Sequence, residues 1–356
     1  MESKSKAPPL RTIYWYLAGS CNLNCRHCWI DPHFGEDGVT YLPWKKMKPL
    51  FEEAKNLGLV SVKLTGGEPL LHPEFTEILY ALKEMKLGIT VETNGTLVGE
   101  SEAKAIAETV SFVSVSLDGT TVEFHEDLRQ VDGCFKNTLK GIENLQKYNK
   151  SFQIIFSLYR KNMDNLFEMV AFAEKQGANS LKVNPVNETD RSREMKNEGE
   201  LLSVKEILDI HDHLKKVTKD KKTIKIYFDI PPAFKALSLL RKHGFQTCGI
   251  FNILGVLHTG RASICGIGSV VKELDLGDPF EIGLEKIWKN NNILNEIRKK
   301  LPNRLTGICG KCMLKNYCLG KCIANTYFLT GDLFNGFIFC EQAYNQGLFP
   351  ETRLIP

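Results

Sequence analysis

Short apolar runs alternate with stretches of helical periodicity over the first 230 residues. The apolar runs are rich in β-branched and aromatic residues and predict strands. The stretches between them repeat apolar residues every three or four positions and predict helices. Strands are predicted at residues 11–17, 60–64, 89–92, 110–117, 152–158, 180–183 and 224–228, and helices at residues 43–56, 75–85, 102–108, 135–148, 163–175 and 202–217.

Strands that are separated by helices of this length pair in parallel through right-handed crossovers. About six such units predict an α/β fold, an open or partial barrel that binds ligands at the carboxyl ends of its strands. Residues 187–200 are polar and predict a loop. Pro231 and Pro232 mark a boundary, beyond which glycines and cysteines replace the alternation. We therefore expect two domains, residues 1–230 and residues 231–356.

Composition and charge exclude some classes of function. An apolar content of 43% and a charged content of 25% are ordinary for a soluble globular protein. The net charge of +4 is small for 356 residues, so we expect no nucleic acid as partner. No apolar run approaches the roughly 18 residues of a membrane helix, and the first residues do not resemble a signal peptide. We therefore expect a cytoplasmic protein that does not bind membranes.

Eleven cysteines change this picture. A reducing compartment disfavours disulfides, and an odd number of cysteines cannot pair completely. The cysteines are also clustered, with three in residues 21–28, two at positions 248 and 265, and five in residues 309–340. Clusters with such short spacings indicate metal ligation.

The first cluster places Cys21, Cys25 and Cys28 in a C-x3-C-x2-C pattern directly after the first predicted strand. Three thiolates can hold three irons of a [4Fe–4S] cube and leave the fourth iron open to a second molecule. The alternative is a zinc loop. Zinc prefers four ligands, and the nearest spare ligand, His27, lies inside the loop itself.

This segment resembles the signature of the radical S-adenosylmethionine (SAM) superfamily, C-x3-C-x-aromatic-C after the first strand of a partial (β/α)6 TIM-like barrel. The resemblance implies that SAM chelates the open iron through its amino and carboxylate groups. One electron then cleaves SAM to methionine and a 5′-deoxyadenosyl radical, which abstracts hydrogen from carbon. His27 occupies the aromatic position, where a ring can pack against adenine.

The resemblance also implies further contacts to SAM. Gly66, Gly67, Glu68 and Pro69 match the motif whose backbone carbonyls receive the SAM amino group. The other expected contacts are Asn94 and Ser116 near the ribose and methionine, Arg129, in a predicted loop, near the carboxylate, and Asn184 at the adenine. Alternatively, the strand-end residues form ordinary turns, and Arg129 is a solvated surface residue.

Seven cysteines near the carboxyl end resemble the SPASM domain of peptide-modifying radical SAM enzymes, over roughly residues 245–345. In that family the domain holds two auxiliary [4Fe–4S] clusters, so the whole chain would carry three. A zinc ribbon would account for residues 309–322 alone. The resemblance assigns Cys309, Cys312, Cys318 and Cys340 to one cluster, and Cys248, Cys265 and Cys322 to the inner one.

The inner cluster has three assigned ligands. Some members of the family carry a further cysteine six residues after the first, where this chain has Leu254. An open iron there could bind a substrate thiolate, because iron is thiophilic. Alternatively, Cys134, His243, His258 or water fills the position. Cys134 matches no motif, and we interpret it as a small buried residue or, less simply, a hydrogen donor.

The resemblance implies a precursor peptide or protein as substrate, and we expect a thioether cross-link. Alternatives are carbon–carbon cross-linking and epimerisation, or, in another class, an iron–sulfur electron carrier. Gly266 follows Cys265 where sulfatase maturases have an aspartate base, which disfavours that activity. Fewer than about twenty residues precede Cys21, too few for a leader-binding domain. A leader could bind a separate protein or an edge strand. Flavodoxin or ferredoxin would supply electrons.

Overall fold

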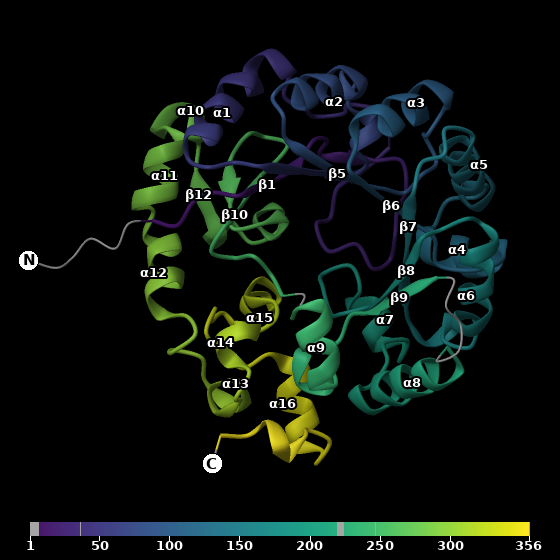
Figure 1. The fold of residues 1–356 in the computed structure, drawn as a ribbon, viewed down its shortest axis with the longest axis vertical. Helices are drawn as coiled ribbons and strands as arrows, with labels where there is room; N and C mark the ends of the chain where they lie inside the picture. The colour runs from purple at the N-terminus through teal and green to yellow at the C-terminus, as the bar shows by residue number, and fades with distance from the viewer. Residues whose placement is uncertain (1–6, 36, 219–223, 246, 356) are drawn as a thin grey trace, which may run out of the picture.

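The core of this computed structural model, which describes residues 7–35, 37–218, 224–245 and 247–355, is one ten-stranded sheet in the order β12-β11-β10-β1-β4-β5-β6-β7-β8-β9. Seven parallel strands of it curve into a partial barrel, as predicted (Figure 1). These strands are β1 (Thr12–Tyr16), β4 (Ser61–Thr65), β5 (Gly88–Thr93), β6 (Phe112–Ser116), β7 (Phe152–Leu158), β8 (Ser180–Pro185) and β9 (Lys225–Phe228).

Helices cover the outside of the barrel (Figure 1). Each follows a strand and returns the chain to the next parallel strand, as right-handed crossovers require. The helices are α1 (Trp44–Asn56), α2 (Phe75–Glu84), α3 (Glu100–Thr109), α5 (Cys134–Lys147), α6 (Asn165–Lys175) and α8 (Val204–Val217).

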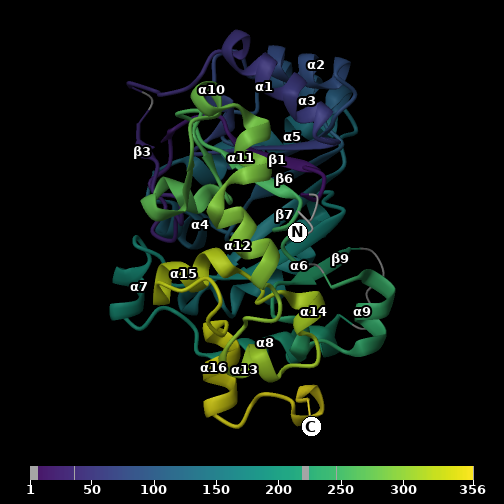
Figure 2. The same ribbon diagram turned by 90° about the vertical axis from the view of Figure 1, so that its left-hand side faces the viewer.

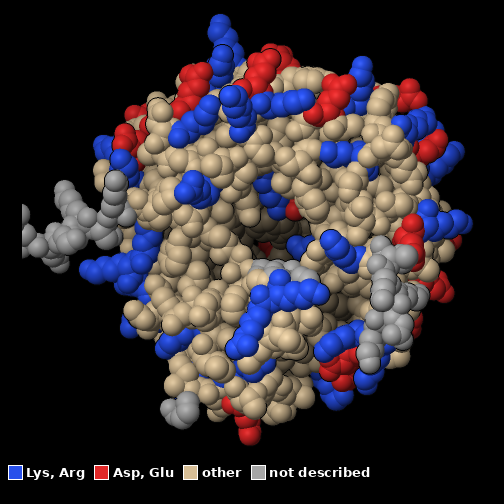
Figure 3. All heavy atoms as spheres, in the orientation of Figure 1, with Lys and Arg blue, Asp and Glu red and all other residues tan. Residues whose placement is uncertain are grey.

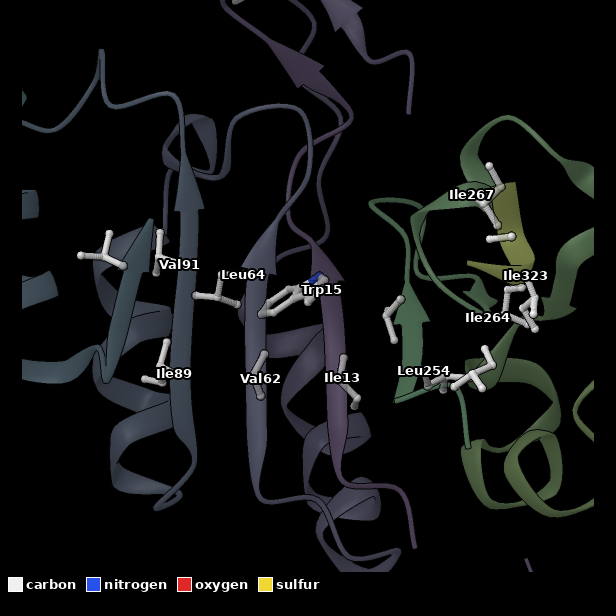
Figure 4. Packing of buried hydrophobic residues seen from close by; sticks show 14 of the residues in the cluster. Ile13, Trp15, Val62, Leu64, Ile89, Val91, Leu254, Ile264, Ile267 and Ile323 are labelled. Carbon is white, nitrogen blue, oxygen red and sulfur yellow. The ribbon is translucent and has the colours of Figure 1, made fainter. Parts of the chain in front are cut away.

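Alternation along the strands divides the barrel into an apolar outside and a polar inside. Ile13 pairs with both Val62 and Leu254, and Val62 pairs with Ile89, so one apolar row crosses four strands (Figure 4). These side chains are buried against the helices, and each contributes about 1.5–3 kcal/mol. The residues between them, such as Lys63, face the barrel interior and line a cavity.

The sheet continues beyond the predicted domain boundary. β10 (Ile253–Val256) pairs in parallel with β1, and β11 (Ala262–Ser263) and β12 (Asp275–Gly277) follow in antiparallel order. The sheet therefore includes residues on both sides of the predicted boundary, and the boundary itself stays a prediction. Leu254 and Val256 are apolar and fully buried, which lets β10 cover the outer edge of β1.

Two segments that were predicted as loops contain helices. Residues 122–129 form α4 (Val122–Arg129), and residues 187–200 include α7 (Arg193–Asn197). Both are short and mostly polar, so their periodicity is weak. Single buried side chains hold them in place, since Leu128 of α4 and Met195 of α7 pack together with Tyr159.

Short helices of the carboxyl-terminal segment close the open side of the barrel (Figures 1 and 2). An ion pair between Lys321 and Asp229 and a hydrogen bond from the Asn325 side chain to the Glu188 carbonyl at 3.3 Å join the two halves. The helices are α9 (Leu237–His243), α10 (Pro279–Ile282), α11 (Leu284–Asn290), α12 (Asn292–Lys300), α13 (Gly307–Lys311), α14 (Lys315–Cys318), α15 (Ile323–Thr330) and α16 (Ile338–Asn345). No helix in the described ranges is long and apolar enough to cross a membrane.

Candidate active site and cysteine clusters

The first three cysteines lie in the loop that follows β1. Cys21 ends β2 (Ser20–Cys21), which pairs with β3 (His33–Phe34), and the Cys28 amide donates to the Cys25 carbonyl. Burial raises the pKa of the Cys21 thiol well above its usual value, and the nearby Cys25 raises it further. Three thiolates are stable in such a place only beside positive charge. Iron supplies that charge, so the residues present fit an iron–sulfur cluster.

Two glycines allow the end of β4 to pack against this loop. A Cβ on Gly67 would overlap the Ser20 carbonyl oxygen, and one on Gly66 would lie 2.9 Å from the Ala18 carbonyl oxygen. The Gly67 amide donates to the Ala18 carbonyl at 2.9 Å. The glycines therefore support the cysteine loop, and their predicted contact with the SAM amino group stays a prediction.

Glu68 and Asn94 also support the cysteine loop through hydrogen bonds. The buried Glu68 carboxylate accepts hydrogen bonds from the Thr93 hydroxyl at 2.6 Å and the Asn94 amide at 2.8 Å. Burial raises the pKa of Glu68 to about 7. The Asn94 side chain donates to Asn22 at 2.9 Å and lies 3.9 Å from the Cys21 sulfur. Neither residue lines the central cavity.

The remaining predicted contacts meet in a cavity of about 480 Å³ inside the barrel. His27, Ser116, Arg129 and Asn184 line it, and Figure 3 shows a hollow with charged side chains inside. His27 Nδ1 and Asn184 Oδ1 are buried without a hydrogen-bond partner in the described structure. Burial lowers the pKa of His27 to about 4, so its ring is neutral at pH 7. These free polar atoms fit a bound cofactor such as SAM.

Arg129 connects the cavity to the cysteine loop. Its guanidinium lies 2.5 Å from the buried Asp118 carboxylate and 3.5 Å from the Cys25 sulfur. Burial is the largest influence on the pKa of Asp118 and would raise it, but Arg129, with smaller contributions from His27, His125 and the Ser157 amide, lowers the pKa overall. Asp118 also accepts from the Ser157 amide at 2.7 Å. Arg129 is therefore a fixed, buried cation, and the alternative of a solvated surface residue was wrong.

The later cysteines form two groups. Cys340 is buried, and its pKa is raised by that burial and by the three other cysteines of its set. Burial also raises the pKa of Cys265, and Cys322 and Cys248 raise it further. In the described ranges, no three His, Cys, Asp or Glu side chains are placed to hold a single metal ion. That these two groups hold clusters stays a prediction.

The described side chains that could supply a fourth ligand to the inner cysteine set lie elsewhere in the structure. Cys134 packs with Cys21 and Cys25, and a Cβ on Gly19 would overlap the His258 ring, so both residues lie beside the first loop. The side chain of His243 lies outside the described residues. Leu254, where some relatives have a cysteine, is fully buried in the sheet.

Comparison with known proteins identifies the barrel. Residues 15–173 match the family model of the Radical SAM superfamily. The chain contains a radical SAM domain. It is 29% identical to an AdoMet-dependent heme synthase of Methanosarcina barkeri, over 96% of this chain and 98% of that protein. It is 24% identical to the mycofactocin maturase MftC of Mycobacterium tuberculosis, over 97% and 86% of the two chains.

A solved structure confirms the fold of this radical SAM enzyme. Streptococcus suis SuiB bound to the precursor peptide SuiA superimposes with a TM-score of 0.74, at 17% identity, over 94% of this chain and 76% of that one. At this identity the likeness concerns the fold alone.

Charged residues inside the barrel of this radical SAM enzyme were missed by motif reasoning. Lys63 pairs with Glu92 at 2.6 Å, and Lys321 pairs with Asp229 at 2.5 Å. Lys182 lines the same cavity from β8. The available signal was a lysine at an alternate position of a short apolar strand, as Lys63 is in β4 and Lys182 is in β8.

Proposed function

We propose that this radical SAM enzyme modifies a precursor peptide held between a SAM site and the inner cysteine set. One observation carries the proposal: a single cavity is lined by His27 and Arg129, which we assign to SAM, and by Cys322 of the inner set. A substrate that fills this space touches both. The name of MftC describes a maturase, and SuiB binds a precursor peptide, which supports the choice of substrate.

The residues of this chain would bind and orient SAM, and they would exclude water from the site. A [4Fe–4S] cluster on Cys21, Cys25 and Cys28, with SAM, would supply a 5′-deoxyadenosyl radical that abstracts hydrogen from carbon. His27 and Asn184 offer their free polar atoms to the adenine side of SAM. Asp118 fixes Arg129, which offers a cation to the SAM carboxylate. The carboxyl-terminal helices close the barrel and keep bulk water from the radical.

The bond we expect is a thioether. The inner set of Cys248, Cys265 and Cys322 offers three thiols, so a cluster bound there keeps one corner for a substrate thiolate. The thiol would lose its proton on binding iron, and a carbon radical formed beside the sulfur would then close a carbon–sulfur bond while the one surplus electron passes to that cluster. Gly266 supports the exclusion of sulfatase maturation, because any Cβ at this position would overlap the Tyr16 ring.

Anaerobic reconstitution tests the radical chemistry. We expect about twelve irons per chain, in three cubes of four, and formation of 5′-deoxyadenosine with SAM and a strong reductant. The Cys21→Ala variant should lose about four irons and all SAM cleavage. The Cys322→Ala variant should keep SAM cleavage and lose product. An iron–sulfur electron carrier would form no 5′-deoxyadenosine at all, and that result would refute the proposal.

Mass spectrometry of a co-expressed peptide identifies the bond. Short peptides encoded beside this gene are the candidates, particularly those rich in cysteine. A thioether removes two hydrogens and protects one cysteine from alkylation. A carbon–carbon cross-link removes two hydrogens and leaves every cysteine reactive, and epimerisation leaves the mass unchanged.

A porphyrin is the second candidate substrate. The 29% identity to the Methanosarcina barkeri heme synthase extends over nearly the full length of both chains. The cavity also carries several lysines, which suit the carboxylates of a porphyrin. Incubation of the reconstituted enzyme with porphyrins and peptides in parallel would decide between the two. A separate leader-binding protein, a flavodoxin or ferredoxin as electron donor, the domain boundary and the cytoplasmic location stay predictions.

A further inference from the structure

Three lysines surround one carboxylate where the barrel meets the carboxyl-terminal segment. Asp229 follows β9, and its carboxylate lies 2.5 Å from the Lys321 ammonium. Lys182 and Lys235 are also close enough to lower the pKa of Asp229, although burial opposes them and Lys321 has the larger effect. The cluster therefore has more positive charges than negative ones.

Ion pairs neutralise most other charges of the cavity. Lys63 is paired with Glu92, and Arg129 with Asp118. Lys182 differs, because it makes no hydrogen bond or ion pair with any residue in the described ranges, yet it is half-buried and lines the cavity. An ammonium group that lines a cavity and makes no hydrogen bond or ion pair can donate to an anion that enters. The position therefore suits an anion that enters the cavity.

The inner cysteines do not account for Lys182. Lys321 and Lys63 are the cations that lower the pKa of Cys248, although burial and Cys322 raise it more, so that it is about 11. Lys182 is not among the main charges acting on any cysteine of the inner set.

From this geometry we infer that Lys182 binds a carboxylate of the substrate, beside the ion pair of Lys321 and Asp229. This inference rests on the proposed function and names the substrate class, a molecule with a carboxylate at the inner end of the cavity. The carboxylate could belong to an acidic residue or the end of a peptide, or to a porphyrin. Lys182 is thereby a specificity-determining residue.

Two matched pairs of probes test the inference on the reconstituted, SAM-loaded enzyme. One pair is hemin and its dimethyl ester, followed by the Soret band. The other is a fluorescent pentapeptide with cysteine, aspartate and a free carboxyl terminus, and its asparagine, amidated counterpart, followed by anisotropy. We expect at least one carboxylate probe to bind more tightly than its uncharged partner. The pair that discriminates identifies the source of the carboxylate.

Substitutions then assign the effect to one residue. Lys182→Met should weaken binding of the discriminating carboxylate probe about tenfold or more, since a charge-assisted hydrogen bond is lost. Lys182→Arg should restore most of the affinity, and Lys175→Met, at the exposed end of α6, should have no effect.

Three results would overturn the inference: no preference for either carboxylate probe, equal weakening by Lys175→Met, or a parallel loss of SAM binding by Lys182→Met. The last result would assign Lys182 to SAM. A failure of the proposed function is distinguishable, because it would appear as absent SAM cleavage in the unsubstituted enzyme, whatever the probes do.

Discussion

Replacement of Asp118 by asparagine leaves the Arg129 guanidinium buried without a neutralising charge. The Asp118 side chain is fully buried, and Arg129 is 6% exposed, so water cannot compensate for the lost carboxylate. Breaking a buried pair in this way costs about 3–5 kcal/mol, whereas an exposed pair is worth about 0–1 kcal/mol. Asparagine can still accept from the Ser157 amide, which limits the change to the charge. We therefore expect the free energy of unfolding to fall by about 3–5 kcal/mol.

Urea denaturation under anaerobic conditions measures this change, provided that the m values of the variants agree. The matched control is Glu206→Gln, because Glu206 pairs with Arg160 on the surface. The double variant Asp118→Leu with Arg129→Met should regain much of the stability, since it removes both charges. If Asp118→Asn costs no more than Glu206→Gln, the buried pair does not stabilise this side of the cysteine loop, and the reasoning is refuted.

Three further substitutions test single features. Gly67→Ala should cost about four irons per chain, because its Cβ overlaps the Ser20 carbonyl; full iron content would contradict the packing role of the glycine. Cys134→Ala should leave product formation intact if the cysteine only packs beside Cys25, and loss of product would indicate a hydrogen donor. Burial, and secondarily a nearby arginine, lower the pKa of His125 to about 4, so the unfolded chain takes up its proton first. The free energy of unfolding should fall as the pH drops below about 6.5, and it should fall less steeply in the His125→Asn variant. An equal dependence on pH in the two proteins would contradict this.

The strands and most helices of the first half could be predicted because their burial is regular: β4 and β5 alternate between buried and partly exposed positions, and other strands are buried almost throughout. β7 was predicted to the residue, since nearly every position is apolar and buried. Helix α4 could not be predicted from the sequence, because its buried face comprises His125, Leu128 and Arg129, of which two are polar. Their burial depends on Asp118, which lies elsewhere in the sequence.

The candidate site, too, has features that could be predicted from the sequence and features that could not. The grouping of cysteines follows from their spacing and the resemblance, since local chain geometry holds the ligands. The roles of Glu68 and Asn94 were less accessible, because a motif does not reveal whether a side chain faces the ligand or the loop behind it. The cavity lysines could not be found by motif, because their meaning depends on charges that other strands contribute.

The two carboxyl-terminal cysteine sets differ in what they can reach. Cys309, Cys312, Cys318 and Cys340 line a small cavity of their own, and none of them borders the large one. Cys322 of the inner set does border the large cavity, which His27 also lines. Of the two carboxyl-terminal sets, the inner one would therefore be the one whose iron a substrate in this cavity can meet. A cube on the outer four would be fully ligated and suited to electron transfer or stability. Loss of the outer set should thus reduce folding or turnover and leave carboxylate binding near Lys182 in place.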